Sequence, residues 1–118
     1  MRITLCGSAR FEGEFKRLNE ELTLRGHVVY SLAVFPSDKA AGKNWYTPVE
    51  KRMLDHVHFL KINNSDAIYV IAGARPAENY IGESTSREIA HAITTRKGLF
   101  CAPGFAAILG PEFIEFLI

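Results

Sequence analysis

The residues best suited to chemistry lie between Tyr80 and Glu88, in the stretch YIGESTSRE. A glycine and three hydroxyl side chains follow an apolar run there and precede a helical pattern. The start of a helix offers free N–H groups and the positive end of the dipole, which favour anions. We therefore predict that this turn binds a phosphate or a sugar and that Glu88 reacts. The residues expected to hold the ligand are Gly82, Ser84, Thr85 and Ser86.

Glu88 has two interpretations on the pattern alone. Thr85-Ser86-Arg87-Glu88 matches a capping box, in which Glu88 bonds back to the helix start. Alternatively, Glu88 lies in the first helical turn, where the dipole favours the ionised form that a carboxylate nucleophile needs. Both interpretations stay open, because one residue can do both.

A second anion-binding turn is expected after the first strand, at Gly7-Ser8-Ala9-Arg10. Gly7 would allow close backbone approach, and Arg10 could make a bidentate contact to phosphate. A Gly-Ser turn also occurs in many α/β proteins merely to cap a helix.

Asp55 and His58 are three residues apart and share one face of the expected second helix. A histidine held by an acid is a candidate proton shuttle, and a surface Asp–His pair is the alternative. His56 and His91 fit no metal-ligand spacing, so neither a metal nor a cofactor is expected. Asp66 precedes the third strand, on the side away from the site, and is expected to be structural.

The loop over residues 33–47 is longer than a usual connection and carries three aromatic residues. Phe35, Trp45 and Tyr46 could stack on a nucleobase. Alternatively, these rings pin the loop to the core.

Apolar runs alternate with helical patterns along the chain. Strands are predicted at residues 2–6, 27–32, 67–72 and 99–102. Thr47-Pro48-Val49-Glu50 predicts the start of the second helix. Its expected buried stripe is Val49, Met53, Val57 and Leu60, and that of the third helix is Ile89, Ala92 and Ile93. A short helix is predicted over residues 111–117.

This alternation predicts an α/β fold of the doubly wound, Rossmann- or flavodoxin-like type. We expect a parallel sheet of order 2-1-3-4 with helices on both faces. Ligands in such folds bind beyond the carboxyl ends of the strands, here near strands 1 and 3.

The 118 residues are typical of a single domain, predicted over 1–118, and a net charge of +1 argues against duplex nucleic acid as a partner. Cys6 and Cys101 lie in apolar runs and are expected to be reduced core residues. No apolar run is long enough to span a membrane, and a cytoplasmic location is expected.

Three segments together resemble the nucleoside 2-deoxyribosyltransferase-like superfamily, which includes nucleoside deoxyribosyltransferases and deoxynucleoside 5'-monophosphate N-glycosidases. They are CGSAR, LDHVHFLKINNSDAIYVI and YIGESTSREIAHA. The match is closest to small phage and bacterial members and runs from about Met1 to Pro103.

The resemblance implies a retaining double displacement on a small-molecule nucleotide or nucleoside, with the nucleophile at Glu88. It places Gly7, Ser8 and Arg10 around the 5'-phosphate, joined by Ser84 and Ser86. Relatives commonly complete their sites across a dimer, so a homodimer or higher homo-oligomer is expected, with the tail FIEFLI as a candidate interface. A protein that binds a nucleotide-derived signal without cleaving it is the alternative.

The chain departs from the family pattern at three places. The family's catalytic aspartate falls on His58, with Asp55 one turn earlier. The acid that faces a free 5'-hydroxyl in the nucleoside transferases falls on Gly82, and family glycines are replaced by hydroxyls. This exchange favours a 5'-phosphate over a free 5'-hydroxyl. The family's tyrosine on the first strand is missing, with Thr4 and Leu5 in that region.

Overall fold

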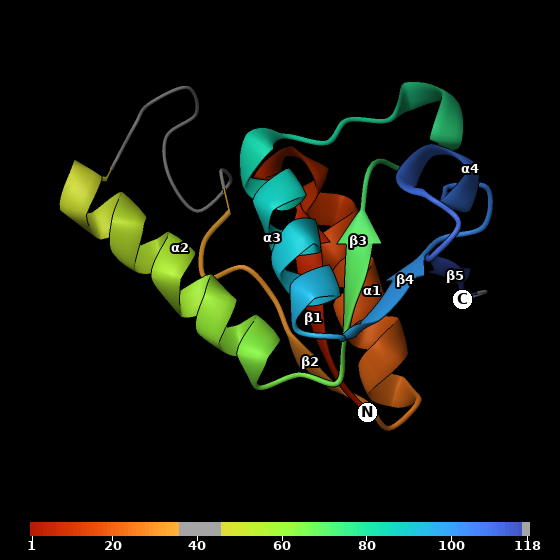
Figure 1. The fold of residues 1–118 in the computed structure, drawn as a ribbon, viewed down its shortest axis with the longest axis horizontal. Helices are drawn as coiled ribbons and strands as arrows, with labels where there is room; N and C mark the ends of the chain where they lie inside the picture. The colour runs from red at the N-terminus through yellow and green to blue at the C-terminus, as the bar shows by residue number, and fades with distance from the viewer. Residues whose placement is uncertain (36–45, 117–118) are drawn as a thin grey trace.

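The computed structural model describes residues 1–35 and 46–116. Among these, five parallel strands form one sheet of order β2-β1-β3-β4-β5, with helices on both faces (Figure 1). The strands are β1 (Arg2–Gly7), β2 (Val28–Tyr30), β3 (Ala67–Ile71), β4 (Gly98–Cys101) and β5 (Ile114–Glu115). The predicted doubly wound fold and the order of its first four strands are confirmed, and a fifth strand is added.

Helix α1 (Glu12–Leu24) covers one face of the sheet. Its apolar residues Phe15, Leu18 and Leu22 recur at helical spacing and pack against Leu5 and Tyr69 of the sheet. All five side chains are buried. This layer confirms the first predicted crossover from strand to helix to strand.

Helices α2 (Pro48–Asn63) and α3 (Glu83–Thr94) cover the opposite face. Ile62 and Ala92 pack there on Ile68 and Val70 of β3, whereas Tyr69 points to the α1 side. Strand β3 is buried along its whole length, as its unbroken apolar run predicts for a central strand.

Two other predicted features at the ends of these elements are confirmed. The Thr47 hydroxyl accepts from the Glu50 N–H at 3.1 Å, and the Glu50 carboxylate accepts from the Thr47 N–H at 2.9 Å. The Asp66 carboxylate accepts from the Arg2 N–H at 2.7 Å, which ties the start of β3 to β1.

The predicted buried stripe of α2 is wrong. Val49, Met53, Val57 and Leu60 are all exposed, Val49 at 64% and Met53 at 58%. The helix instead turns His58 and Ile62 into the protein. Periodicity identified an apolar stripe correctly, but it could not reveal that this stripe faces outward. Ile93 of α3 is likewise exposed rather than inward.

The predicted terminal helix over 111–117 is also wrong. The chain forms a short helix α4 (Ala106–Leu109) and then β5. Gly110 has a φ of 132°, which ends α4, and the Phe116 N–H donates to the Cys101 carbonyl of β4. The Glu115 carboxylate also accepts the N–H groups of Gly104 and Ala106, which fixes the tail as a strand.

The order of the strands places a crevice at one edge of the sheet. From β1 the chain crosses to β2 on one side, and β3 lies on the other side of β1. The carboxyl ends of β1 and β3 therefore flank the point where the winding reverses, which is where such folds bind ligands. Within the described residues, no helix is long and apolar enough to cross a membrane.

Candidate functional site

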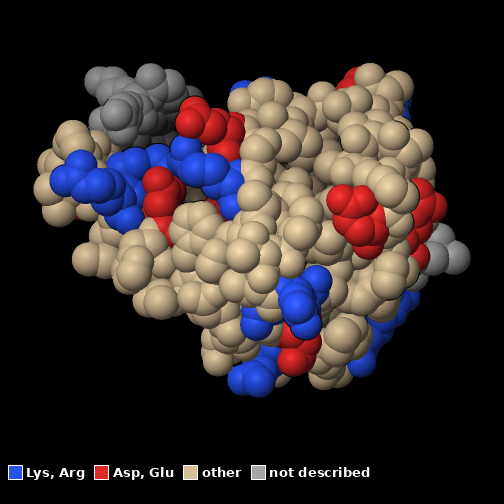
Figure 2. Space-filling model, in the orientation of Figure 1, with Lys and Arg blue, Asp and Glu red and all other residues tan. Residues whose placement is uncertain are grey.

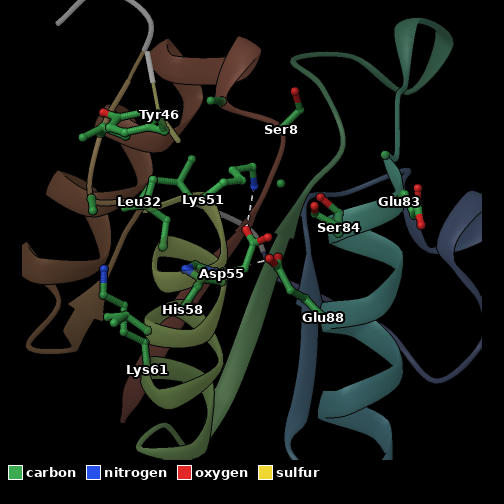
Figure 3. Close-up of a pocket in the computed structure, with 18 of the residues that line it drawn as sticks. Ser8, Leu32, Tyr46, Lys51, Asp55, His58, Lys61, Glu83, Ser84 and Glu88 are labelled. Atoms are coloured by element: carbon green, nitrogen blue, oxygen red, sulfur yellow. Dashed lines mark hydrogen bonds and ion pairs between the residues drawn. The ribbon is translucent and has the colours of Figure 1, made fainter. Parts of the chain in front are cut away.

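A cavity of about 490 Å³ opens at the carboxyl ends of β1, β2 and β3, between α2 and the start of α3 (Figure 3). This volume is within the range of small-ligand sites. Its polar lining side chains are Ser8, Tyr46, Lys51, Asp55, His58, Lys61, Tyr80, Glu83, Ser84, Thr85 and Glu88. The cavity lies where the fold and the two predicted turns place a ligand.

The turn after β1 contributes to the wall of the cavity. The Ser8 hydroxyl accepts from the Arg10 N–H at 3.3 Å and caps a short 3-10 helix. A Cβ at Gly7 would lie 2.4 Å from the Ile71 carbonyl oxygen, so only glycine fits between β1 and β3 there. Gly7 and Ser8 line the cavity.

Arg10 does not line the cavity. Its guanidinium lies over the Tyr80 ring, 3.7 Å from the ring centroid, and Tyr80 does line it. Reaching a phosphate would require Arg10 to leave this stacking contact. Its assignment to phosphate remains a prediction.

The hydroxyl-rich turn proves to be the first turn of α3. Gly82 is the N-cap, and Ser84 and Thr85 line the cavity, while Ser86 is exposed and lies outside the lining. Helix α3 begins two residues before Thr85, so the predicted capping box does not form. Glu88 therefore lies in the second turn rather than the first.

Glu88 points from α3 toward α2 across the inner end of the cavity (Figure 3). It is 8% exposed, and burial raises the pKa of its carboxyl from 4.5 to about 7. A hydrogen bond with the Cys6 thiol and the nearby Lys51 act in the opposite direction. Burial therefore opposes the ionised form that the position of Glu88 on the helix was expected to favour.

His58 faces Glu88 rather than Asp55. Its Nε2 lies 3.7 Å from Glu88 Oε1 and 3.7 Å from Cys6 Sγ. Burial is the main cause that lowers the pKa of His58 from 6.5 to about 4, with nearby Lys61 adding to it. His58 is therefore neutral at pH 7, and its contact with Glu88 is a polar contact rather than an ion pair.

Asp55 accepts a 2.7 Å ion pair from Lys51 Nζ, which is four residues earlier on α2. In Figure 3, Lys51 reaches over the cavity toward this carboxylate, and Asp55 lies above Glu88. Asp55 adds to the raised pKa of Glu88 by repulsion. The predicted Asp55–His58 pair is thus replaced by an Asp55–Lys51 pair within the same cavity.

Sequence reasoning did not select the polar lining residues Lys51, Lys61, Tyr80 and Glu83, nor Cys6 beside them. Lys61 lines the cavity, its Nζ donates to the Ser31 carbonyl at 2.8 Å, and burial lowers its pKa. Lys51 had a usable signal, because Lys51 and Asp55 have the spacing of a helical ion pair. Cys6 had no such signal in the sequence, because it lies within an apolar run. In the structure its thiol forms a hydrogen bond with Glu88.

The three predicted aromatic residues have different positions. Tyr46 lines the cavity. Phe35 packs edge-to-face on Phe15, with ring centroids 5.5 Å apart, so it joins the core below α1. Trp45 lies outside the described residues.

Charged side chains gather around the cavity more than over the rest of the same face. Figure 2 shows Lys and Arg interleaved with Asp and Glu over the N-terminal parts of α2 and α3, beside a hollow. The pairs Lys51–Asp55 and Arg87–Glu83 contribute to this pattern. The mixture is compatible with a small ligand that carries both an anionic group and neutral polar groups.

A search of solved structures finds a similar protein. It is a 2-deoxyribosyltransferase from the psychrotolerant bacterium Bacillus psychrosaccharolyticus, with a TM-score of 0.64 and 13% sequence identity. The match covers 86% of this chain and 71% of that one. The two proteins share a fold. No family model and no curated protein matches the sequence. The resemblance stated from the motifs is thereby confirmed at the level of the fold.

Proposed function

We propose that this protein cleaves the N-glycosidic bond of a nucleoside 5'-monophosphate, with ribose or deoxyribose, through a covalent glutamyl-sugar intermediate. The observation that carries this proposal is the position of Glu88. Its carboxyl lines a cavity of about 490 Å³ that the Gly7-Ser8 turn and the start of α3 also line. A sugar bound in this cavity would present C1' to the carboxylate and its 5' side to the hydroxyls.

The proposed reaction has two balanced steps. In the first, an oxygen of ionised Glu88 forms a bond to C1' as the C1'–N bond breaks, and the electron pair leaves with the base. The leaving base takes up a proton from solvent water, relayed by Asp55 or His58 in the cavity lining. In the second, a water oxygen, or a nitrogen of a second base, attacks C1', its proton returns to solvent through the same relay, and the bond from C1' to Glu88 breaks to release the carboxylate.

The phosphate would be held at the carboxyl edge of the sheet. Ser8 and Ser84 offer hydroxyls there, and the N–H groups at the start of α3 favour an anion. Lys51 would supply a cation at the rim, after exchanging its ion pair with Asp55. The nucleoside transferases that the chain resembles have an acidic residue at the position of Gly82. Its absence here also supports a substrate that carries a 5'-phosphate.

The direct test is incubation with a panel of nucleoside and deoxynucleoside 5'-monophosphates, with free base followed by chromatography. Glu88→Gln keeps the size and polarity of the side chain but removes the nucleophile, and should abolish base release. The control is Glu78→Gln, an exposed glutamate away from the cavity lining, which should keep the wild-type rate. Base release that survives Glu88→Gln unchanged would refute the assignment.

A second function is favoured by the state of His58. Where the family has an acid, this chain has a buried, neutral imidazole. A protein that binds a nucleotide without cleaving it would need no such acid. Calorimetry separates the two functions, because a binder would show saturable heat with the nucleotide recovered intact.

We also propose that two copies associate through α2. Val49, Met53, Val57 and Leu60 form an exposed apolar stripe along this helix, and Met53 and Val57 also line the cavity. A second copy bound to this stripe would cover the exposed side of the cavity that Met53 and Val57 form. The predicted tail interface has less support, because Phe113 is buried in the core of its own chain.

Light scattering tests this association. The wild type should have the mass of a dimer, and the double variant Val49→Ser, Leu60→Ser should have that of a monomer, because these two residues lie on the stripe but not in the cavity lining. A monomeric wild type at micromolar concentration would contradict the proposal.

A further inference from the structure

Three metal-ligating side chains converge at the inner end of the cavity. Cys6 comes from β1, His58 from α2 and Glu88 from α3, and one ligand atom of each lies within 4.8 Å of the others. The Cys6 Sγ–His58 Nε2 and His58 Nε2–Glu88 Oε1 distances are both 3.7 Å. Spacing in the sequence gave no hint of this set, because 52 residues separate Cys6 from His58.

The distances fit a tetrahedral ion. Zinc bonds to sulfur at about 2.3 Å and to nitrogen or oxygen at about 2.0–2.1 Å, so neighbouring ligand atoms at tetrahedral angles lie about 3.3–3.5 Å apart. The two observed distances of 3.7 Å exceed this by only a few tenths of an ångström. Small side-chain rotations would close the set around an ion.

The charges also balance. A thiolate, a carboxylate and a neutral imidazole together carry two negative charges, which a divalent cation neutralises. All three side chains are buried, and a neutral complex avoids the cost of burying net charge. Because a thiolate and an imidazole are both ligands, the set favours an ion of the zinc class over calcium or magnesium.

We propose that Cys6, His58 and Glu88 bind one divalent ion of the zinc class. Binding releases the thiol proton of Cys6, and the carboxyl proton of Glu88 where it is present, to solvent. It leaves a fourth position for a water on the cavity side, since His58 and Glu88 line the cavity. The ion binds the Glu88 carboxylate, which is the nucleophile of the proposed glycosyl transfer. Metal binding and attack on C1' therefore exclude one another, and the ion inhibits the proposed reaction.

Cobalt(II) is the probe, because a cobalt–thiolate bond gives a near-ultraviolet charge-transfer band that needs no substrate. Titration of chelator-treated protein should show this band saturating at one equivalent, and zinc should displace it. The matched control uses the second buried cysteine: Cys101→Ser should keep the band and Cys6→Ser should lose it. His58→Gln should weaken cobalt binding at least tenfold.

X-ray absorption of the zinc-loaded wild type keeps the test independent of variants that misfold. It should show one sulfur at about 2.3 Å and nitrogen or oxygen neighbours at about 2.0 Å. A first shell without sulfur, or a cobalt band that persists in Cys6→Ser, would overturn the proposal. Because both measurements omit nucleotide, their outcome is separate from that of the base-release assay. If base release is found, zinc should inhibit it.

Discussion

The buried pair of His58 and Glu88 should control how stability depends on pH. Burial lowers the pKa of His58 from 6.5 to about 4 and raises that of Glu88 from 4.5 to about 7. Between pH 4.5 and 6.5, the folded pair therefore holds one proton. The unfolded chain also holds one, on the histidine, so the pair gives the wild type almost no pH slope in this window.

Each single substitution exposes one half of this balance. In Glu88→Gln, the remaining His58 has a lower pKa in the folded state, so stability is lost as pH falls from 6.5 toward 4. In His58→Gln, the remaining Glu88 has a higher pKa in the folded state. Its contribution is fully present below pH 4.5 and is lost as pH rises through about 7.

The magnitude follows from the size of the shifts. The pKa of His58 falls from 6.5 to about 4, and that of Glu88 rises from 4.5 to about 7, so each changes by about 2.5. A pKa difference of one between the folded and unfolded states corresponds to ~1.4 kcal/mol. Each variant should therefore change its free energy of unfolding by ~3 kcal/mol across its window, with opposite signs. Both side chains are shielded from solvent, so little of this is lost to screening.

The assay is urea denaturation of metal-free protein, with a chelator present, at a series of pH values between about 4 and about 7. The double variant should return to the pH profile of the wild type, which separates the pair from every other titrating group. Glu78→Gln serves as the exposed control. The reasoning is refuted if both single variants follow the wild-type profile, because burial would then not be shifting either group.

Two further predictions concern the frame around the site. Gly7→Ala should destabilise the protein by about 1–3 kcal/mol, because its Cβ would meet the Ile71 carbonyl at 2.4 Å. Gly13→Ala in α1, where a Cβ meets nothing within 4 Å, should instead stabilise it by about 0.5–1 kcal/mol, and equal effects in denaturant melts would contradict the packing argument. The Arg2 N–H lowers the pKa of Asp66 from 3.8, so the stability that Asp66 adds is present above that pH and lost below it. Thermal melts should therefore show a deficit in Asp66→Asn at neutral pH that shrinks in acid.

The sequence alone determined the layers of the fold. The unbroken apolar run of β3 could only be a strand covered on both faces, and the Thr47-Pro48-Glu50 cap located the start of α2. The rule that ligands bind at the carboxyl ends of parallel strands then placed the cavity near Gly7 and Gly82. These inferences hold because they depend on local periodicity, backbone conformation and the handedness of crossovers.

Tertiary structure decided what each side chain of the site faces. The apolar stripe of α2 points outward, and His58 turns inward toward Glu88 and Cys6, although periodicity favoured the reverse. The state of Glu88 was also decided there, because its pKa depends mainly on burial in the folded chain rather than on its place in one helix. A periodic pattern identifies the faces of a helix, but only the packing of the whole chain determines which face is covered and which groups lose their water.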